Sequence, residues 1–176
     1  MIRKATEADI PAVAAIFDRI HTEEERGLGE TGWVRGIYPT EDTAREALVA
    51  GELYVLEEEG RVFAAARINQ AEVPEYALAR WQHPARPEEI LVLHTLVVDP
   101  REQGRGLGRR FVAFYEALGR ELGAPELRMD TNVRNAFARR LYARLGYREV
   151  GTVPCVFNGI PGVKLVCLEK RLEDES

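Results

Sequence analysis

Apolar residues recur every three or four positions from 10 to 20, a spacing that predicts a helix with one buried face. Thr6 and Asp9 precede this stretch and resemble a capping pair at its start. A short strand at 2–4 is expected before the helix, and a loop rich in glycine and aromatic residues, 27–40, follows it. The chain is therefore expected to begin with a strand that leads into an amphipathic helix.

The next stretches change from helical spacing to the apolar runs of strands. A brief helix that opens at Thr40 or Asp42 comes first. Residues 53–58 and 61–69 then form two runs joined by a glycine turn, which predicts a β-hairpin. The run ILVLHTLVV, 90–98, is apolar almost throughout and is typical of a central strand with neighbours on both sides. The residues between have mixed composition and predict a long connection with one helical turn.

The last third of the chain alternates helices and strands. Apolar positions at helical spacing predict a helix over 107–122, which a Gly-Ala-Pro sequence stops. The remaining expected elements are a strand at 127–131, a helix at 135–145 and strands at 148–157 and 163–171. No repeat or linker interrupts this order, so the pattern predicts one mixed α/β domain over residues 1–176.

The composition is that of a folded protein with an acidic balance. Hydrophobic residues make up 45% of the 176 residues, charged residues 30%, and the net charge is −5. General nucleic-acid binding normally needs a basic face, so we expect no nucleic-acid partner. The chain lacks an apolar signal segment at its start and any run of the roughly 18 apolar residues a membrane helix needs, which favours a cytoplasmic protein. Cys155 and Cys167 are not spaced as a metal or redox pair and are expected to be buried thiols, and no metal site is expected.

Residues 99–110, DPREQGRGLGRR, join the apolar strand to the following helix. A glycine-rich turn at a helix N-terminus presents unpaired backbone N–H groups, which suit a phosphate. Arginines at this end of a helix oppose its dipole, and a bound anion would reverse that penalty. A P-loop needs a Gly-Lys-Ser/Thr ending, and the dinucleotide fingerprint needs glycine where Arg109 stands. On the glycines alone, a loop that merely turns tightly remains the alternative.

Two segments carry a resemblance to a known family. The Q-x-x-G-x-G pattern at 103–108, directly after L-V-V-D-P at 96–100, resembles the acetyl-coenzyme A signature of the GNAT N-acetyltransferases. The second family segment is similar at 130–131, D-T, and at 135–147, N-A-x-A-x-x-L-Y-x-x-L-G-Y. The resemblance implies the GNAT fold, a mostly antiparallel sheet of about seven strands with four helices and a splayed cofactor cleft. It also implies transfer of acetyl from acetyl-CoA to a primary amine of a small molecule or peptide, by direct attack in a ternary complex.

The resemblance assigns the cofactor contacts to three segments. The strand before the loop pairs its backbone with the pantetheine arm, whose amides need partners. The backbone amides of the loop hold the pyrophosphate, with its arginines as local positive charge, and the next helix completes the site. The implied cofactor contacts are Leu96, Val97, Val98, Gln103, Gly104, Arg105, Gly106, Leu107, Gly108, Arg109, Asn135 and Tyr142.

Two residues are candidates for proton transfer. Tyr142 matches the family tyrosine that protonates the leaving thiolate, a role that suits a weakly acidic phenol. A core aromatic with a satisfied hydroxyl is the alternative. His94 shares a strand face with Leu96 and Val98, and histidine stands at this position in some arylalkylamine-type members of the family. It is our candidate for the base; the alternatives are a structural histidine and a water chain to Glu72 or another loop carboxylate.

The resemblance places the acceptor pocket between the loop 27–40 and the connection before the cofactor strand. The aromatic candidates for binding the acceptor are Trp33, Tyr38, Tyr76 and Trp81. Together with Glu25, Glu30 or Glu75 they would suit a cationic amine, although they would equally well cap the core. The pattern W-x-x-G-x-Y-P resembles a bacterial GNAT subgroup of unassigned acceptor, so no specific amine follows.

Two other functions remain open on the sequence. A non-catalytic acyl-CoA sensor or interaction module would keep the cofactor cleft without turnover. Nucleic-acid binding through the arginine loop would require an affinity that falls steeply with salt, against the overall acidity of the chain. A homodimer is compatible with the family, but no stretch specifies an interface.

Overall fold

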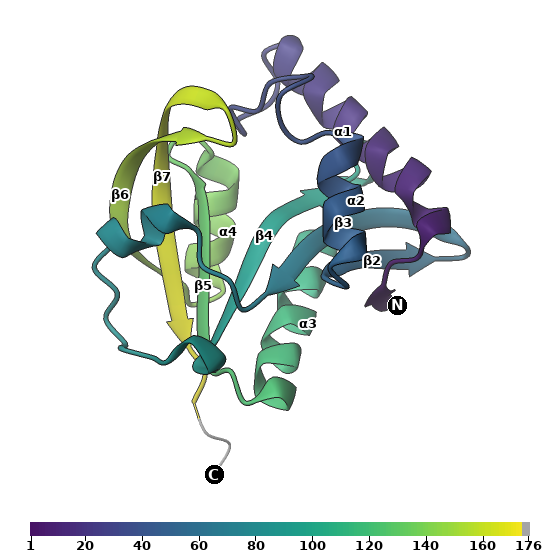
Figure 1. Cartoon of the computed structure of the whole chain (residues 1–176). Coiled ribbons are helices and arrows are strands. Elements are labelled where there is room, and N and C mark those ends of the chain that lie inside the picture. The colour runs from purple at the N-terminus through teal and green to yellow at the C-terminus, as the bar shows by residue number, and fades with distance from the viewer. Residues whose placement is uncertain (174–176) are drawn as a thin grey trace.

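A computed structural model describes residues 1–173, and within them one seven-stranded sheet runs in the order β1-β2-β3-β4-β5-β7-β6 (Figure 1). The strands are β1 (Ile2–Lys4), β2 (Leu53–Glu58), β3 (Arg61–Asn69), β4 (Ile90–Val98), β5 (Glu126–Asn132), β6 (Arg148–Phe157) and β7 (Ile160–Arg171). The α-helices are α1 (Ile10–Glu25), α2 (Glu41–Val49), α3 (Leu107–Leu122) and α4 (Ala136–Arg144). Only β4 and β5 pair in parallel; the other neighbours are antiparallel. The expected mixed α/β fold is confirmed.

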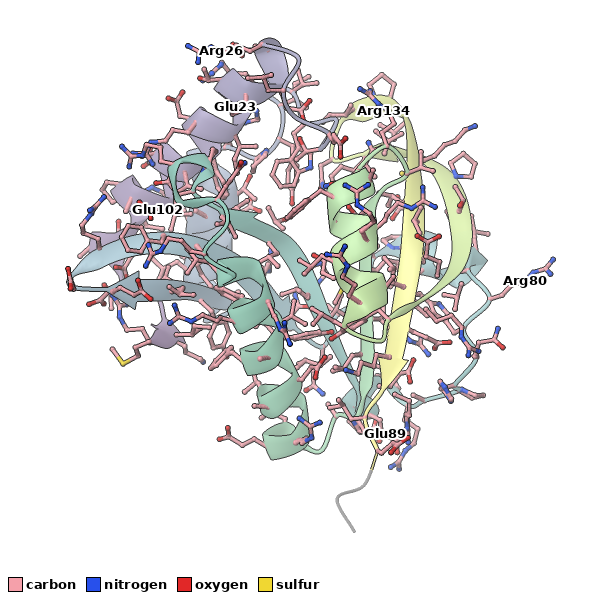
Figure 2. The ribbon with its side chains drawn as sticks, turned by 180° about the vertical axis from the view of Figure 1, so that it is seen from behind. Glu23, Arg26, Arg80, Glu89, Glu102 and Arg134 are labelled. Carbon is pink, nitrogen blue, oxygen red and sulfur yellow. The ribbon has the colours of Figure 1, made fainter. Side chains whose placement is uncertain are left out.

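Helices cover both faces of the sheet, because each helix carries one apolar face. On one side α1 and α2 pack through Ile16 and Ala44 against strand residues such as Val55. On the other side α3 and α4 pack through Phe111 and Tyr142, and Figure 2 shows these two helices from that side. The strands between are therefore buried from both directions, which explains the continuous apolar run of β4.

The sheet splays open between β4 and β5. The two strands pair only over the first four residues of β4, from Ile90 to Leu93. Beyond them Thr95 has a left-handed backbone with φ of 52°, and the register with β3 shifts at the same place. The bulge bends β4 away from β5, and Figure 1 shows the two strands diverging from the bottom of the view upward. The opening leaves one edge of each strand without a strand partner.

Two local predictions differ from the structure. β7 begins at Ile160, three residues before the expected start, because Asn158 and Gly159 alone form the turn and Phe157 pairs with Ile160. Pro161 is tolerated there because β5 pairs with β7 only from Leu165 onward. The long connection after β3 contains two short 3₁₀ helices instead of one helical turn, at Pro74–Leu78 and Pro87–Glu89.

Cys155 is partly buried and Cys167 is buried, and both are free thiols, as expected. No helix of the described chain combines the length and the apolarity needed to cross a membrane. Among residues 1–173, no group of three or more His, Cys, Asp or Glu side chains is arranged to hold a metal ion.

A buried pair of glutamates lies at the end of the sheet where β5 begins. Glu126 and Glu169 are 0% and 2% exposed, and one oxygen of each, Oε2, has no hydrogen-bond partner within the described residues. Arg128 donates to the other oxygen of Glu126 at 3.3 Å. Burial first, and then hydrogen bonding to Glu169, raises the pKa of Glu126 to about 8. Glu126 is therefore protonated in the folded protein at neutral pH.

Replacing Glu126 by glutamine is expected to remove a loss of stability at higher pH. In the unfolded chain the pKa of glutamic acid is about 4.3. The folded state thus holds an extra proton between that value and about 8, and stability falls as pH rises through this window. The melting temperature of Glu126→Gln, relative to wild type, is expected to rise by several degrees between about pH 5 and about pH 8. Thermal unfolding across pH measures this, with Glu121→Gln on the exposed side of α3 as control; parallel curves for Glu126→Gln and wild type would contradict it.

Candidate active site

Two cavities meet where β4 and β5 diverge. The inner pocket, about 90 Å³, lies between the splayed strands and α4. The outer pocket, about 580 Å³, lies between the splay, α2 and the connection after β3. Thr95, Asp130 and Phe157 line both pockets. The two pockets thus lie side by side at the bulge of β4.

The inner pocket contains the tyrosine and the asparagine predicted from the sequence. Tyr142 is 7% exposed, and its hydroxyl has no hydrogen-bond partner in the described chain. Burial first, and then the charge of Asp130, holds the pKa of this phenol well above its usual value. The side chain of Asn135 caps α4 by accepting from the Ala138 amide at 3.1 Å. Tyr142 therefore presents an unengaged O–H group to the inner pocket.

The open edge of β4 offers backbone groups to the same cleft. The Asp99 amide donates to the Phe63 carbonyl at 2.8 Å, across the pairing with β3. Because hydrogen-bonded pairs alternate along antiparallel strands, the N–H and C=O of Val98 point away from β3, toward the splay. The side chains of Leu96 and Val98 pack on the α3 side, whereas that of Val97 packs under α1. His94 lines the outer pocket on the opposite face, so the expectation that it shares a face with Leu96 and Val98 is wrong, because the bulge at Thr95 breaks the alternation.

The loop before α3 exposes backbone amides as predicted. Gly104 and Gly106 have φ of 82° and 70°, and a Cβ built on either meets no atom within 4 Å. The first helical hydrogen bond runs from the Arg110 amide to the Gly106 carbonyl at 3.0 Å. The N–H groups of residues 107–109 therefore have no partner within the helix. Unpaired amides at a helix N-terminus beside open space are an arrangement that suits an anion such as a phosphate.

The arginines of this loop are mostly occupied by carboxylates. Arg105 pairs with Glu102 at 2.6 Å and also with Glu58 of the β2–β3 hairpin; Figure 2 labels Glu102 in the loop. Arg110 pairs with the same Glu58. Arg109 is exposed and has no ion pair with any described residue. The structure thus differs from the expectation that the arginines as a group serve the ligand.

In the outer pocket, His94 is held as a neutral ring. Its Nε2 lies 2.7 Å from Asn69 Oδ1, an oxygen that can only accept, so Nε2 carries the hydrogen. Asn69 in turn donates from Nδ2 to Glu52 at 3.0 Å. Burial first, and then the charge of Arg67, lowers the pKa of His94 to about 4. His94 is therefore uncharged and a weak base at neutral pH.

Asp130, which belongs to the D-T family segment and was not predicted as a site residue, lines both pockets. Tyr76 donates its hydroxyl to Asp130 Oδ2 at 2.6 Å, whereas Oδ1 has no partner in the described chain. Burial raises the pKa of Asp130 to about 6, and the bond from Tyr76 acts in the opposite direction. One feature of the sequence could have identified Asp130: it is a carboxylate near the end of an apolar strand that comes directly before α4.

The four aromatic residues proposed for the acceptor lie in two places. Trp33 lines the inner pocket and Tyr38 the outer one, and Tyr38 shares a hydrogen bond with Thr95 at the bulge. Tyr76 is 1% exposed, and Trp81 donates to its carbonyl at 2.7 Å. Neither lines either pocket, so Tyr76 reaches the site only through Asp130. Of the candidate carboxylates, Glu72 lines the outer pocket, where it pairs with Arg128 at 2.9 Å.

Comparison with known proteins identifies the family of this chain. The model of the acetyltransferase (GNAT) family matches residues 16–147. The chain belongs to the GNAT family of acetyltransferases. A GNAT-family acetyltransferase from Streptococcus agalactiae has the same fold, with a TM-score of 0.82 at 21% identity over 99% of this chain and 96% of that one. The structure of a Salmonella typhimurium acetyltransferase with acetyl-CoA has a TM-score of 0.67 at 20% identity. The match covers 100% of this chain and 95% of that one.

One curated relative of this GNAT protein has a named activity. It is the aminoglycoside N(6′)-acetyltransferase type 1 of Stenotrophomonas maltophilia, 28% identical over 122 residues, which are 67% of this chain and 77% of that protein. Together the family match and these relatives show an acetyl-CoA-dependent N-acetyltransferase. The acceptor amine is not fixed by any of them.

Proposed function

We propose that this GNAT protein acetylates a primary amine by direct attack in a ternary complex, with the amine in the outer pocket. The observation that carries the proposal is the junction of the two pockets at Asp130. Because the two pockets share Asp130, a group bound in the inner pocket would lie next to a group bound in the outer one. A ternary complex therefore needs no covalent relay on the protein.

Bound acetyl-CoA would supply an acetyl group already activated as a thioester. The residues that would hold it are the loop amides from Gly104 to Arg109, with Gln103 beside them, and the open edge of β4 at 96–98. Asn135 lies on the inner pocket and would contact the cofactor from α4. Arg109, the exposed arginine without an ion pair, would add positive charge near the phosphates.

Proton transfer would be divided between the two pockets. On the acceptor side, the free Oδ1 of Asp130 would bind the ammonium form of the acceptor and take its proton. A carboxylate with a pKa near 6 is ionised at neutral pH and is a better base there than an imidazole with a pKa near 4. His94, our sequence candidate, would then border the amine as a neutral ring. On the cofactor side, Tyr142 would give its unengaged proton to the departing sulfur as the amide bond forms.

The size and lining of the outer pocket favour a small-molecule acceptor. Its volume of about 580 Å³ lies within the range of roughly 300–1,000 Å³ that ligand pockets occupy. Tyr38 would border the amine from the loop after α1, and Trp33, whose ring centroid is 5.9 Å from that of Tyr38, would support it from the inner pocket. The named activity of the Stenotrophomonas maltophilia relative, on an aminoglycoside, also supports an amine on a small molecule. We also propose a cytoplasmic location, which the free thiols support.

Turnover with a panel of amines tests this function. Purified protein with acetyl-CoA and small-molecule amines is expected to release free coenzyme A, with kinetics that require both substrates on the enzyme at once. Absence of coenzyme A release above background with every amine, including peptides, would refute the catalytic proposal. Tight acetyl-CoA binding without transfer would instead favour a sensor or interaction module.

Replacing Gly106 by aspartate is expected to weaken coenzyme A binding roughly tenfold or more, or at least about 1.4 kcal/mol. The side chain would occupy open space beside the free amides of α3 and bring negative charge to the proposed pyrophosphate site. Calorimetry with coenzyme A measures the change. Gly106→Ala serves as control, because it shares the strain of a φ of 70° but adds no charge. Equal affinity of Gly106→Asp and wild type would count against this placement of the cofactor.

A further inference from the structure

The outer pocket carries more negative charge than its own cations balance. Glu72 pairs with Arg128, and Arg67, which also lines the pocket, pairs with Glu52. Three lining carboxylates remain without an ion pair in the described chain. They are Asp42, Glu46 and Asp130. The pocket is therefore built for a ligand with positive charge.

Two of these carboxylates lie together on α2. Asp42 and Glu46 are one helical turn apart, an arrangement in which like charges repel. Neither has a hydrogen bond or an ion pair from its side chain to any residue of 1–173. By contrast Glu41, in the same first turn, pairs with Arg45 at 2.8 Å. The helix face toward the pocket thus holds two unbalanced charges, whereas the neighbouring position is balanced.

The third carboxylate lies on another element. Asp130 is near the end of β5, and in Figure 1 β5 and α2 stand on opposite sides of the diverging β4. Between them the lining is mixed. It includes the apolar residues Phe17, Ala47 and Leu53 and the polar residues Asn69 and His94, together with Arg67, whose charge is paired with Glu52. The pocket therefore has an unpaired anionic group at each end.

We propose that the acceptor is a small oligoamine with two spaced ammonium groups. One ammonium group lies at Asp130 and is the amine that is acetylated; the second lies at Asp42 and Glu46 and sets specificity. The part of the molecule that joins them crosses the middle of the pocket. This inference rests on the proposed function, because it assigns the second binding end of the same site. Linear polyamines and amino sugars both carry spaced ammonium groups, and the test below separates them.

Matched amines test the inference. Wild-type protein is assayed with a series of α,ω-diaminoalkanes, with the monoaminoalkanes of equal chain length, and with an aminoglycoside. The diamine is expected to have the higher kcat/KM at each length. Asp42→Asn with Glu46→Gln is expected to reduce this advantage by roughly two- to fivefold for each carboxylate, the range of an exposed ion pair. The double variant should lose more activity with the diamine than with the monoamine of equal length, and Glu41→Gln should leave both activities unchanged.

Each outcome decides a separate point. Equal kcat/KM for diamine and monoamine in wild type would overturn the inference while leaving the acetyltransferase proposal intact, as would a diamine advantage that survives in the double variant. Preference for the aminoglycoside over every diaminoalkane, lost in the double variant, would keep the two-ammonium site and assign it to amino sugars. If no amine is acetylated, the proposed function fails. Thermal unfolding with coenzyme A and a diamine then tests binding in the outer pocket without turnover. A diamine that raises the melting temperature of wild type and not of the double variant supports the two-ammonium site. An equal rise in both proteins overturns it.

Discussion

Replacing Tyr142 by phenylalanine is expected to lower kcat about 10²-fold or more and to leave the affinity for acetyl-CoA nearly unchanged. The hydroxyl has no hydrogen-bond partner in the described chain and borders the inner pocket, so its loss leaves no buried protein group unsatisfied. The ring would still pack edge-to-face on Tyr147, with centroids 6.0 Å apart. The loss should therefore fall on protonation of the departing sulfur and hardly at all on binding.

Steady-state kinetics together with calorimetric binding of acetyl-CoA measure both quantities. Tyr147→Phe is the matched control, because it removes a neighbouring buried hydroxyl that donates to Glu116 at 3.1 Å and does not line the inner pocket. That control is expected to lose some stability but to keep its turnover per folded molecule. Full activity in Tyr142→Phe, or an equal loss in Tyr147→Phe, would show that Tyr142 is a core aromatic.

Local patterns in the sequence predicted the parts of the fold that depend on local physics. The helical stripe of α3 and the hairpin of β2 and β3 were confirmed because apolar periodicity and a glycine turn specify them nearly alone. The start of β7 was missed because Pro161 and Gly162 are typical turn residues, and only the missing β5 partner makes them acceptable in a strand. A partner strand distant in sequence carries no signal in the local pattern.

In the candidate site, too, the local features were predicted from the sequence, whereas the contacts between distant residues were not. Gly104 and Gly106 were placed correctly in an open loop before α3 because positive φ and a helix N-terminus are local features. The pairing of Arg105 with Glu58 was not foreseen, since it joins residues 47 positions apart. Asp130 was likewise undervalued, because its raised pKa comes from burial and its orientation from Tyr76, 54 positions away. The charge state of a side chain depends on its tertiary surroundings. The sequence motifs therefore indicated the position of the cleft more directly than the residue that could act as the base.

Replacing Asp130 by asparagine is expected to lower kcat/KM by about 10²–10⁴-fold and to remove its dependence on a group titrating near pH 6. In wild type the carboxylate must be ionised to bind an ammonium group and accept its proton. Activity should therefore rise as pH increases through about 6 and then level off until the acceptor itself loses its proton. Measuring kcat/KM as a function of pH tests for this ascending limb near pH 6.

A comparison with His94 distinguishes the two candidate bases. His94→Asn is expected to keep the limb near pH 6, because the ring is already neutral there with a pKa of about 4. A limb that survives in Asp130→Asn and disappears in His94→Asn would reverse the assignment.

The hydroxyl of Tyr76 allows an independent test of whether Asp130 is the group that titrates. Its hydrogen bond to Oδ2 lowers the pKa of Asp130 against the effect of burial, so Tyr76→Phe should raise that pKa. The ascending limb is then expected to move to higher pH while the maximal rate changes little. Tyr76 is fully buried and does not line the pockets, so loss of packing alone would change stability without moving the limb. A limb at the same pH in Tyr76→Phe and wild type would mean that the titrating group is not Asp130.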